Sequence, residues 1–131
     1  MKIGIGLPIG RPENLLTWAR RAAPLDFAGD LFRAVEKSWQ DTGRDGKPRL
    51  VAQVNVALGD ESTVDEARSA ILAYYGFGGE LAAQTAARML TTPAAIRDTV
   101  AAFADLGADE TIFYCWSPDP AQVDRLAQLA G

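Results

Sequence analysis

The chain has 131 residues, of which 48% are hydrophobic and 23% charged, and its net charge is −4. These values are typical of one globular domain, which we expect to span residues 1–131. Nucleic-acid binding needs a concentrated basic face, so the acidic balance argues against a nucleic-acid partner. No apolar run is long enough to cross a bilayer and the start lacks a signal-peptide pattern, so we expect no membrane partner and a cytoplasmic location.

The sequence contains one cysteine, Cys115, and no histidine. A single cysteine cannot form an internal disulfide and suits a reducing cytoplasm. Because histidine is the commonest metal ligand and general base, we expect no metal site. Cys115 has neither a histidine nor a nearby basic residue to favour the thiolate, so it is predicted to be an inert small hydrophobe.

The N-terminal third is predicted to hold one strand and two helices. Residues 2–8 alternate isoleucine or leucine with glycine, which is the pattern of a strand. Pro12 then opens a short helix. From Asp26 to about Thr42, apolar residues recur every four positions and predict an amphipathic helix. Its apolar stripe consists of Phe27, Leu31, Val35 and Trp39.

The stretch 49–59 alternates strictly, is rich in β-branched residues and predicts the central strand. Its apolar parity consists of Ala52, Val54, Val56 and Leu58. The opposite parity places two amides, Gln53 and Asn55, in the middle of the strand. Two interpretations stay open: the amides lie on a solvated outer face, or they line a polar cavity.

Three helices are predicted between this strand and the next one. The first begins between Asp60 and Thr63, with Thr63 and Glu66 spaced as a capping box, and ends at the glycine-rich hinge 76–79. A second spans 80–90. The third has Thr92 as its N-cap, followed by Pro93. Its buried stripe is predicted to consist of Ile96, Val100 and Phe103.

Residues 109–116 form a continuous apolar and aromatic run, which predicts a third strand buried on both faces. Asp119 and Pro120 then cap a last helix, whose Val123, Leu126 and Leu129 are expected to face inward. Because strands alternate with helices, we expect parallel pairing with right-handed crossovers. Three such strands with helices on one side would leave the other sheet face open.

The segments Lys2–Pro8, Gly43–Leu50 and Ala101–Glu110 resemble the bacterial luciferase-like monooxygenase family. Its members are eight-stranded α/β barrels, which typically run to ~250 residues. The resemblance implies a truncated TIM barrel that lacks strands two to six, with the join near residues 22–24. The retained strands would form a three-stranded parallel arc in the order seven, eight, one.

In this family, flavin or deazaflavin lies at the carboxyl-end mouth of the barrel and is held largely by the middle strands. Those strands have no counterpart here, and the histidine that members often place near the cofactor is absent. The resemblance therefore implies that the flavin has been lost, with a bound flavin or deazaflavin as the alternative.

Three functions stay open. The favoured one is a small-molecule enzyme or binding protein whose amides and phenols orient a polar handle on an apolar ligand, with cyclisation or isomerisation as the chemistry. The predicted site residues are Gln53, Asn55, Tyr114 and Trp116, with Arg11 and Tyr74 or Tyr75 near the mouth. The alternatives are a flavin or deazaflavin oxidoreductase completed by a second subunit, and a noncatalytic assembly module. Because parallel sheets are almost always covered on both faces, we also expect an obligate homodimer.

Overall fold

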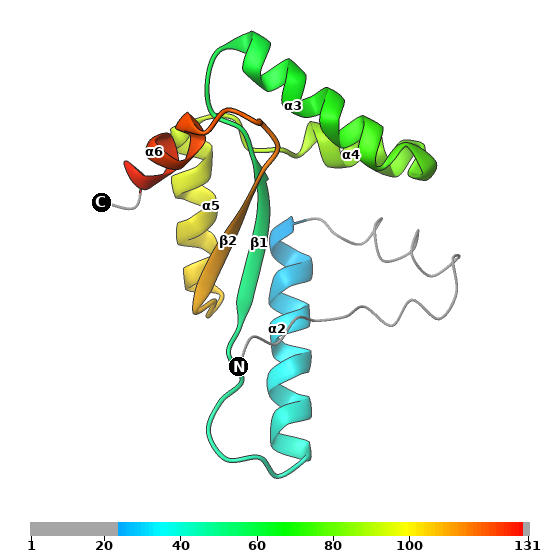
Figure 1. Cartoon of the computed structure of the whole chain (residues 1–131). Coiled ribbons are helices and arrows are strands. Elements are labelled where there is room, and N and C mark those ends of the chain that lie inside the picture. Colours follow the sequence, from blue (N-terminus) through cyan, green and yellow to red (C-terminus); the bar gives the residue numbers. More distant parts are fainter. Residues whose placement is uncertain (1–23, 130–131) are drawn as a thin grey trace.

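The computed structural model describes residues 24–129 (Figure 1). In order, they form α2 (Pro24–Asp41), β1 (Val51–Val56), α3 (Glu61–Tyr74), the 3₁₀ helix η1 (Gly76–Gly78), α4 (Glu80–Ala87), α5 (Pro93–Asp105), β2 (Glu110–Cys115) and α6 (Ala121–Ala127). The predicted α/β class is therefore confirmed. The predicted strand 2–8, the helix opened by Pro12 and the predicted site residue Arg11 lie outside the described residues.

The two strands pair in parallel, as predicted, with a register from Val51 opposite Glu110 to Val56 opposite Cys115. At its carboxyl end, β1 also makes an isolated parallel bridge to Leu90 on its outer edge. The Leu90 amide donates to the Asn55 carbonyl at 2.9 Å, and the Leu90 carbonyl accepts from the Ala57 amide at 3.0 Å. Within residues 24–129, the outer edge of β2 has no strand partner.

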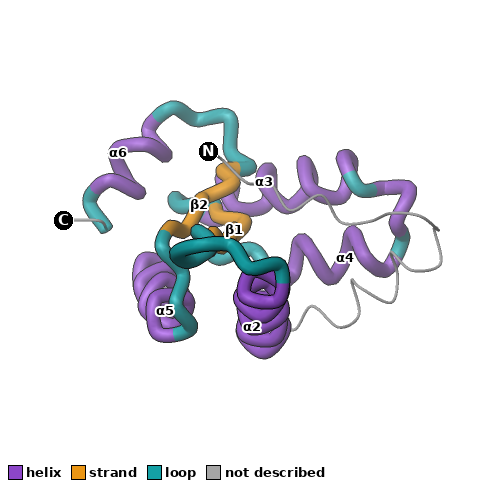
Figure 2. The backbone as a smooth tube through the Cα atoms, turned by 90° about the horizontal axis from the view of Figure 1, so that it is seen from below, coloured by secondary structure: helices purple, strands orange, loops and turns teal. Residues whose placement is uncertain are grey.

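One face of the sheet is covered by α2 and α5, which lie side by side in Figure 2. Phe32 of α2 and Phe103 of α5 are each only 3% exposed. The two buried clusters of this layer consist of Phe32, Leu50, Ala52 and Phe103, and of Val56, Leu58 and Ile96. The apolar parity of the central strand therefore faces the helices, as its alternation predicted. Thr92 caps α5 as predicted, since its hydroxyl accepts from the Ala95 amide at 3.2 Å.

The opposite face of the sheet is open along most of β2. Ile112 is 41% exposed and Tyr114 51% exposed, and Gln53 beside them is also exposed. The prediction that β2 is buried on both faces is therefore wrong. Its apolar run reflects one side packed on α5 and one side that no helix of the described chain covers.

The hairpin of α3, η1 and α4 lies beyond the carboxyl end of β1 (Figure 1). The start of α3 corrects the predicted capping box, because the N-cap is Asp60 and not Thr63. The backbone amide and the hydroxyl of Thr63 both donate to the Asp60 carboxylate at 2.8 Å, and the first of these bonds is the main reason why the pKa of Asp60 is lowered. The predicted helix 80–90 is too long, because α4 ends at Ala87. Leu90 is extended and forms the bridge to Val56 of β1.

The last helix, α6, is held by a buried amide and by two of its three predicted apolar residues, because Leu126 and Leu129 pack against the cluster of Val56, Leu58 and Ile96. Gln122 is 2% exposed, whereas Val123, predicted to face inward, is 71% exposed. The Gln122 side chain accepts from the Leu58 amide at 2.9 Å and donates to the Leu58 carbonyl. Asp119 acts as a cap as predicted, although from one position before the N-cap Pro120, by accepting from the Ala121 amide at 3.0 Å.

No helix among the described residues is long and apolar enough to cross a membrane.

Candidate functional site

The candidate site lies on the open face of the sheet, at the carboxyl ends of the two strands. Asn55 and Tyr114 are paired in the parallel register and therefore project from the same face, and Trp116 follows two residues after Tyr114. Helices α3 and α4 gather at this end in Figure 1. Carboxyl ends of parallel strands are where ligands bind in open α/β sheets and in barrels.

A hydrogen bond joins the two strands at this point. The indole Nε1 of Trp116 donates to Oδ1 of Asn55 at 2.9 Å, and both side chains are partly buried. An indole N–H is only a donor, so the Asn55 amide must present its oxygen to Trp116. The bond therefore fixes both the indole plane and the orientation of the amide.

Aromatic rings from α3 and η1 surround Trp116. The Trp116 ring lies 5.7 Å from that of Tyr74 and 5.9 Å from that of Tyr75, and Tyr75 lies 6.4 Å from Phe77. These separations and tilted geometries are those of favourable aromatic pairs. The outer rings are open to solvent, with Tyr74 68% exposed and Phe77 81% exposed. We call Asn55, Tyr74, Tyr75, Phe77, Tyr114 and Trp116 the aromatic site.

Below this layer, Trp116 and Tyr75 rest on the buried cluster of the α3–α4 hairpin. The cluster consists of Ala57, Val64, Ala67, Ile71, Ala86 and Met89. Because Ala67 and Ile71 are fully buried, the hairpin is anchored against the end of β1. The inner rings of the site are therefore held by packing, while the outer rings stay accessible.

The Tyr75 phenol of the aromatic site stays protonated at neutral pH. Burial raises the pKa of Tyr75, and the neighbouring phenols of Tyr74 and Tyr114 raise it further. The site thus offers a neutral hydrogen-bond donor next to apolar ring surfaces.

Sequence analysis left Tyr74 and Tyr75 as alternatives near the mouth, and the structure brings both together with Asn55, Tyr114 and Trp116. Gln53 lies two residues before Asn55 on the same face of β1. There it lines, together with Ile112, a groove of about 650 Å³ between the sheet and α2. It therefore belongs to the open face but not to the aromatic site. Sequence reasoning missed Phe77. The signal that could have found it is an aromatic residue between two glycines in a turn, because side chains in turns are usually exposed.

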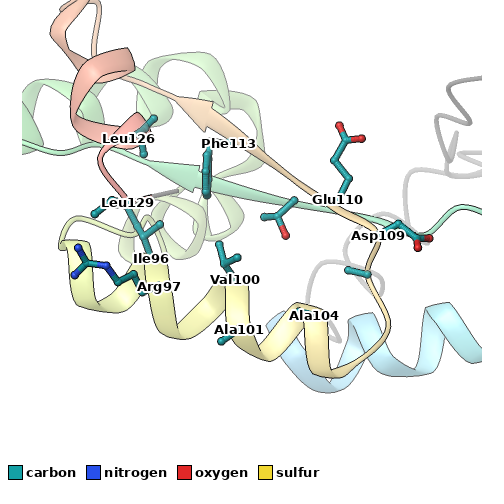
Figure 3. A pocket seen from close by; sticks show the side chains of 12 residues that line it. Ile96, Arg97, Val100, Ala101, Ala104, Asp109, Glu110, Phe113, Leu126 and Leu129 are labelled. Atoms are coloured by element: carbon teal, nitrogen blue, oxygen red, sulfur yellow. The ribbon is translucent and has the colours of Figure 1, made fainter. Parts of the chain in front are cut away.

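A second hollow runs along the free edge of β2, between α5 and α6 (Figure 3). It has a volume of about 430 Å³. The apolar side chains that point into it are Ile96, Val100, Phe113, Leu126 and Leu129. Its charged residues, Arg97 and the pair Asp109 and Glu110, lie at opposite ends, so no set of polar groups converges in it. This hollow lacks the few convergent polar groups that define most ligand sites.

Cys115 ends β2 opposite Val56 in the register, and although its strand parity is that of the covered face, the residue is exposed. Its thiol contacts the amide oxygen of Gln122 at 3.6 Å. Burial raises the pKa of this thiol and outweighs the lowering caused by its hydrogen bond to the Ser117 backbone. A higher pKa means less thiolate at neutral pH, and the inert role of this exposed thiol stays a prediction.

Comparisons with protein-family models, with curated proteins and with solved structures give no match to this chain. The resemblance to the luciferase-like family therefore stays a prediction. Among residues 24–129, no group of three or more aspartate, glutamate, cysteine or histidine side chains is gathered as a metal site would require.

Proposed function

We propose that this chain binds an apolar small molecule with a polar handle at the aromatic site, and that it converts the molecule by isomerisation or cyclisation. The observation that carries this proposal is the Asn55–Trp116 hydrogen bond, set among exposed aromatic rings at the carboxyl ends of parallel strands. Exposed rings of this kind supply apolar contact area, and a fixed amide supplies orientation.

The proposed chemistry follows from the donors that the site contains. The Tyr75 phenol has a raised pKa and stays a neutral donor, and the Asn55 amide is also neutral. Such groups can hold a flexible molecule in a reactive conformation and can stabilise charge that develops on an oxygen. The reaction that we propose is therefore one that orientation and hydrogen bonding can drive without an ionised acid–base pair.

We further propose that two copies of the chain face each other through their open sheet faces and enclose the ligand between them. Ile112, Tyr114, Tyr74 and Phe77 together present a large apolar surface to water, which is unusual for a monomer. A twofold pairing of this face would cover it in both copies at once.

The finer architecture that we propose is the three-stranded arc of a truncated luciferase-like barrel. Residues 2–8 would form its third strand on the free edge of β2. Their alternating Ile3, Ile5 and Leu7 would place apolar side chains toward the hollow between α5 and α6. The free edge and the apolar hollow support this placement.

Sedimentation equilibrium at low micromolar concentration tests the pairing. We expect the wild-type chain to be a dimer and Ile112→Lys to be a monomer, because a charge would be buried at the centre of the interface. Val123→Lys is the matched control: Val123 is exposed on α6, away from the open face, so this variant should stay dimeric. A folded wild-type monomer under these conditions would refute the pairing.

Equilibrium dialysis with 2-ethylnaphthalene, a flat hydrocarbon probe, tests ligand binding. We expect binding to the wild-type chain and to Val123→Ala, and a large loss in Tyr114→Ala, which removes an exposed ring of the site. Equal binding by Tyr114→Ala would place the ligand elsewhere. A purified protein with flavin absorbance would favour the oxidoreductase alternative, and a dimer that binds no probe would favour the assembly module.

A further inference from the structure

We infer that the aromatic site selects ligands that carry a neutral carbonyl group, such as an aryl ketone, whose oxygen accepts a hydrogen bond from the Asn55 side chain. This inference rests on the proposed function and names its ligand class. It starts from the single hydrogen bond that fixes the Asn55 amide.

The bond to Trp116 uses the oxygen of the Asn55 side chain and leaves its nitrogen pointing away from the indole. Within the described residues, that nitrogen has no hydrogen-bond partner, although Asn55 is partly buried. A primary amide nitrogen is a donor with two hydrogens and no acceptor capacity. Since no buried side-chain nitrogen or oxygen among the described residues lacks a partner, this nitrogen is open to solvent. The free group of the site is therefore an accessible donor held in one direction, and an acceptor on a ligand can replace its water.

The register places this donor beside an aromatic surface. Tyr114 lies directly opposite Asn55 on the neighbouring strand and is 51% exposed. Neighbouring strands of a sheet lie about 5 Å apart, so side chains directly opposite each other on one face are close neighbours. A flat ligand stacked on the Tyr114 ring would thus bring a substituent oxygen within reach of the Asn55 nitrogen.

A neutral acceptor fits this surface better than a carboxylate. The groups that shift the pKa of Tyr75 are its own burial and the phenols of Tyr74 and Tyr114, all of which raise it. An anion bound among these groups would be desolvated without a charged partner from this set, which is costly. A ketone or aldehyde oxygen accepts a hydrogen bond without that cost.

The test compares two probes of similar shape, 2-acetonaphthone and 2-ethylnaphthalene, by equilibrium dialysis against the full-length chain. Both carry the same ring system, and only the first has a carbonyl oxygen. We expect the ketone to bind the wild-type chain roughly fivefold more tightly, a ratio that one neutral hydrogen bond commonly supplies.

Asn55→Asp is the decisive variant. Its carboxylate can still accept from the Trp116 indole, but the outward nitrogen becomes an oxygen that repels a carbonyl. We expect the preference for the ketone to disappear while 2-ethylnaphthalene still binds. Gln53→Glu makes the same change of charge one pleat away on the same face, so its preference should match that of the wild type.

The outcomes separate the two proposals. If the wild-type chain binds both probes equally, the carbonyl inference is wrong and the proposed function stands. If Gln53→Glu loses the preference as fully as Asn55→Asp, general charge repulsion explains it and the assignment to Asn55 is wrong. If neither probe binds, the proposed function fails and this inference fails with it. Should Asn55→Asp not fold, Asn55→Ala removes the donor without adding charge and should lose the preference in the same way.

Discussion

The two faces of the small sheet differ in how deeply their side chains are buried, and therefore in which residues each face can accept. The face toward α2 and α5 contains side chains such as Ala52 and Val56 that are almost fully buried, so packing limits which residues fit there. The other face contains amides and half-exposed rings at the corresponding positions of the same two strands. Because side chains alternate along each strand, the same two strands present one set of residues to the core, where they stabilise the fold, and another set to the open face, where they are free to contact a ligand.

The largest expected difference between the two faces is in how much a truncated side chain lowers the free energy of unfolding. Phe103→Ala should lower the free energy of unfolding by ~3–5 kcal/mol, because it removes a buried ring and leaves a cavity. Ile112→Ala on the open face should cost less than ~1 kcal/mol in the monomer, because much of its surface is already in water. Urea unfolding at several protein concentrations measures both values. Similar costs at low concentration would show that the open face is covered within a single chain.

A smaller loss is expected from the buried amide that holds α6. Gln122→Leu leaves the Leu58 amide without its partner and should cost ~1–3 kcal/mol. The Leu58 carbonyl keeps its bond from Arg125, at 2.8 Å, which limits the loss. Gln128→Leu, on the exposed end of the same helix, is the control and should change the unfolding free energy by less than ~0.5 kcal/mol. Thermal denaturation that ranks the two variants equally would contradict this role for Gln122.

The two amides of the open face should differ from each other. Asn55→Leu removes the acceptor of the Trp116 indole and should cost about 1 kcal/mol of stability, together with the preference for the ketone probe. Gln53→Leu should change stability by less than ~0.5 kcal/mol, since the Gln53 side chain is exposed. Chemical denaturation followed by probe dialysis separates the two effects. A larger loss of binding in Gln53→Leu would move the site toward the groove along α2.

The smallest effect is expected at Cys115. Since burial raises its pKa in the folded chain, the protonated thiol favours the native state below the unfolded pKa, and this contribution is lost as pH rises through the folded pKa. Native Cys115 should therefore react with iodoacetamide at pH 8 more slowly than the urea-unfolded chain, and Cys115→Ser should keep near-normal function. Faster alkylation of the native chain, or complete inactivation of a stable Cys115→Ser variant, would show that the thiol takes part in the chemistry.

Local patterns predicted most of the fold because each depends on neighbours in sequence. The alternation of 49–59 identified β1 and its buried parity, and the Thr92–Pro93 pair located the start of α5. The errors arose where distant segments meet. Leu90 left a helical pattern to pair with β1, and α6 turned so that Gln122 binds Leu58, which no helical periodicity reveals. Exposure of β2 on one side likewise depends on which helices the chain places nearby.

The candidate site was predictable to a similar degree. Asn55 and Tyr114 lie opposite each other on the two strands, and Trp116 comes two residues after Tyr114. Because side chains alternate between the two faces of a strand, the sequence predicted that these three residues project from the same face. Phe77 follows η1's first glycine, and its approach to Tyr75 depends on how the α3–α4 turn folds back. That geometry is tertiary, and a single sequence carries only a weak signal of it.

The Leu90 bridge has a consequence for self-association. An unpaired strand edge offers backbone donors and acceptors to any other extended chain, and it is a common starting point for aggregation. At the carboxyl end of β1, Leu90 already occupies those groups, so a foreign strand cannot extend the sheet there. Growth by strand addition next to the aromatic site is thereby restricted to the β2 edge, which is the edge that residues 2–8 would occupy in the proposed three-stranded arc.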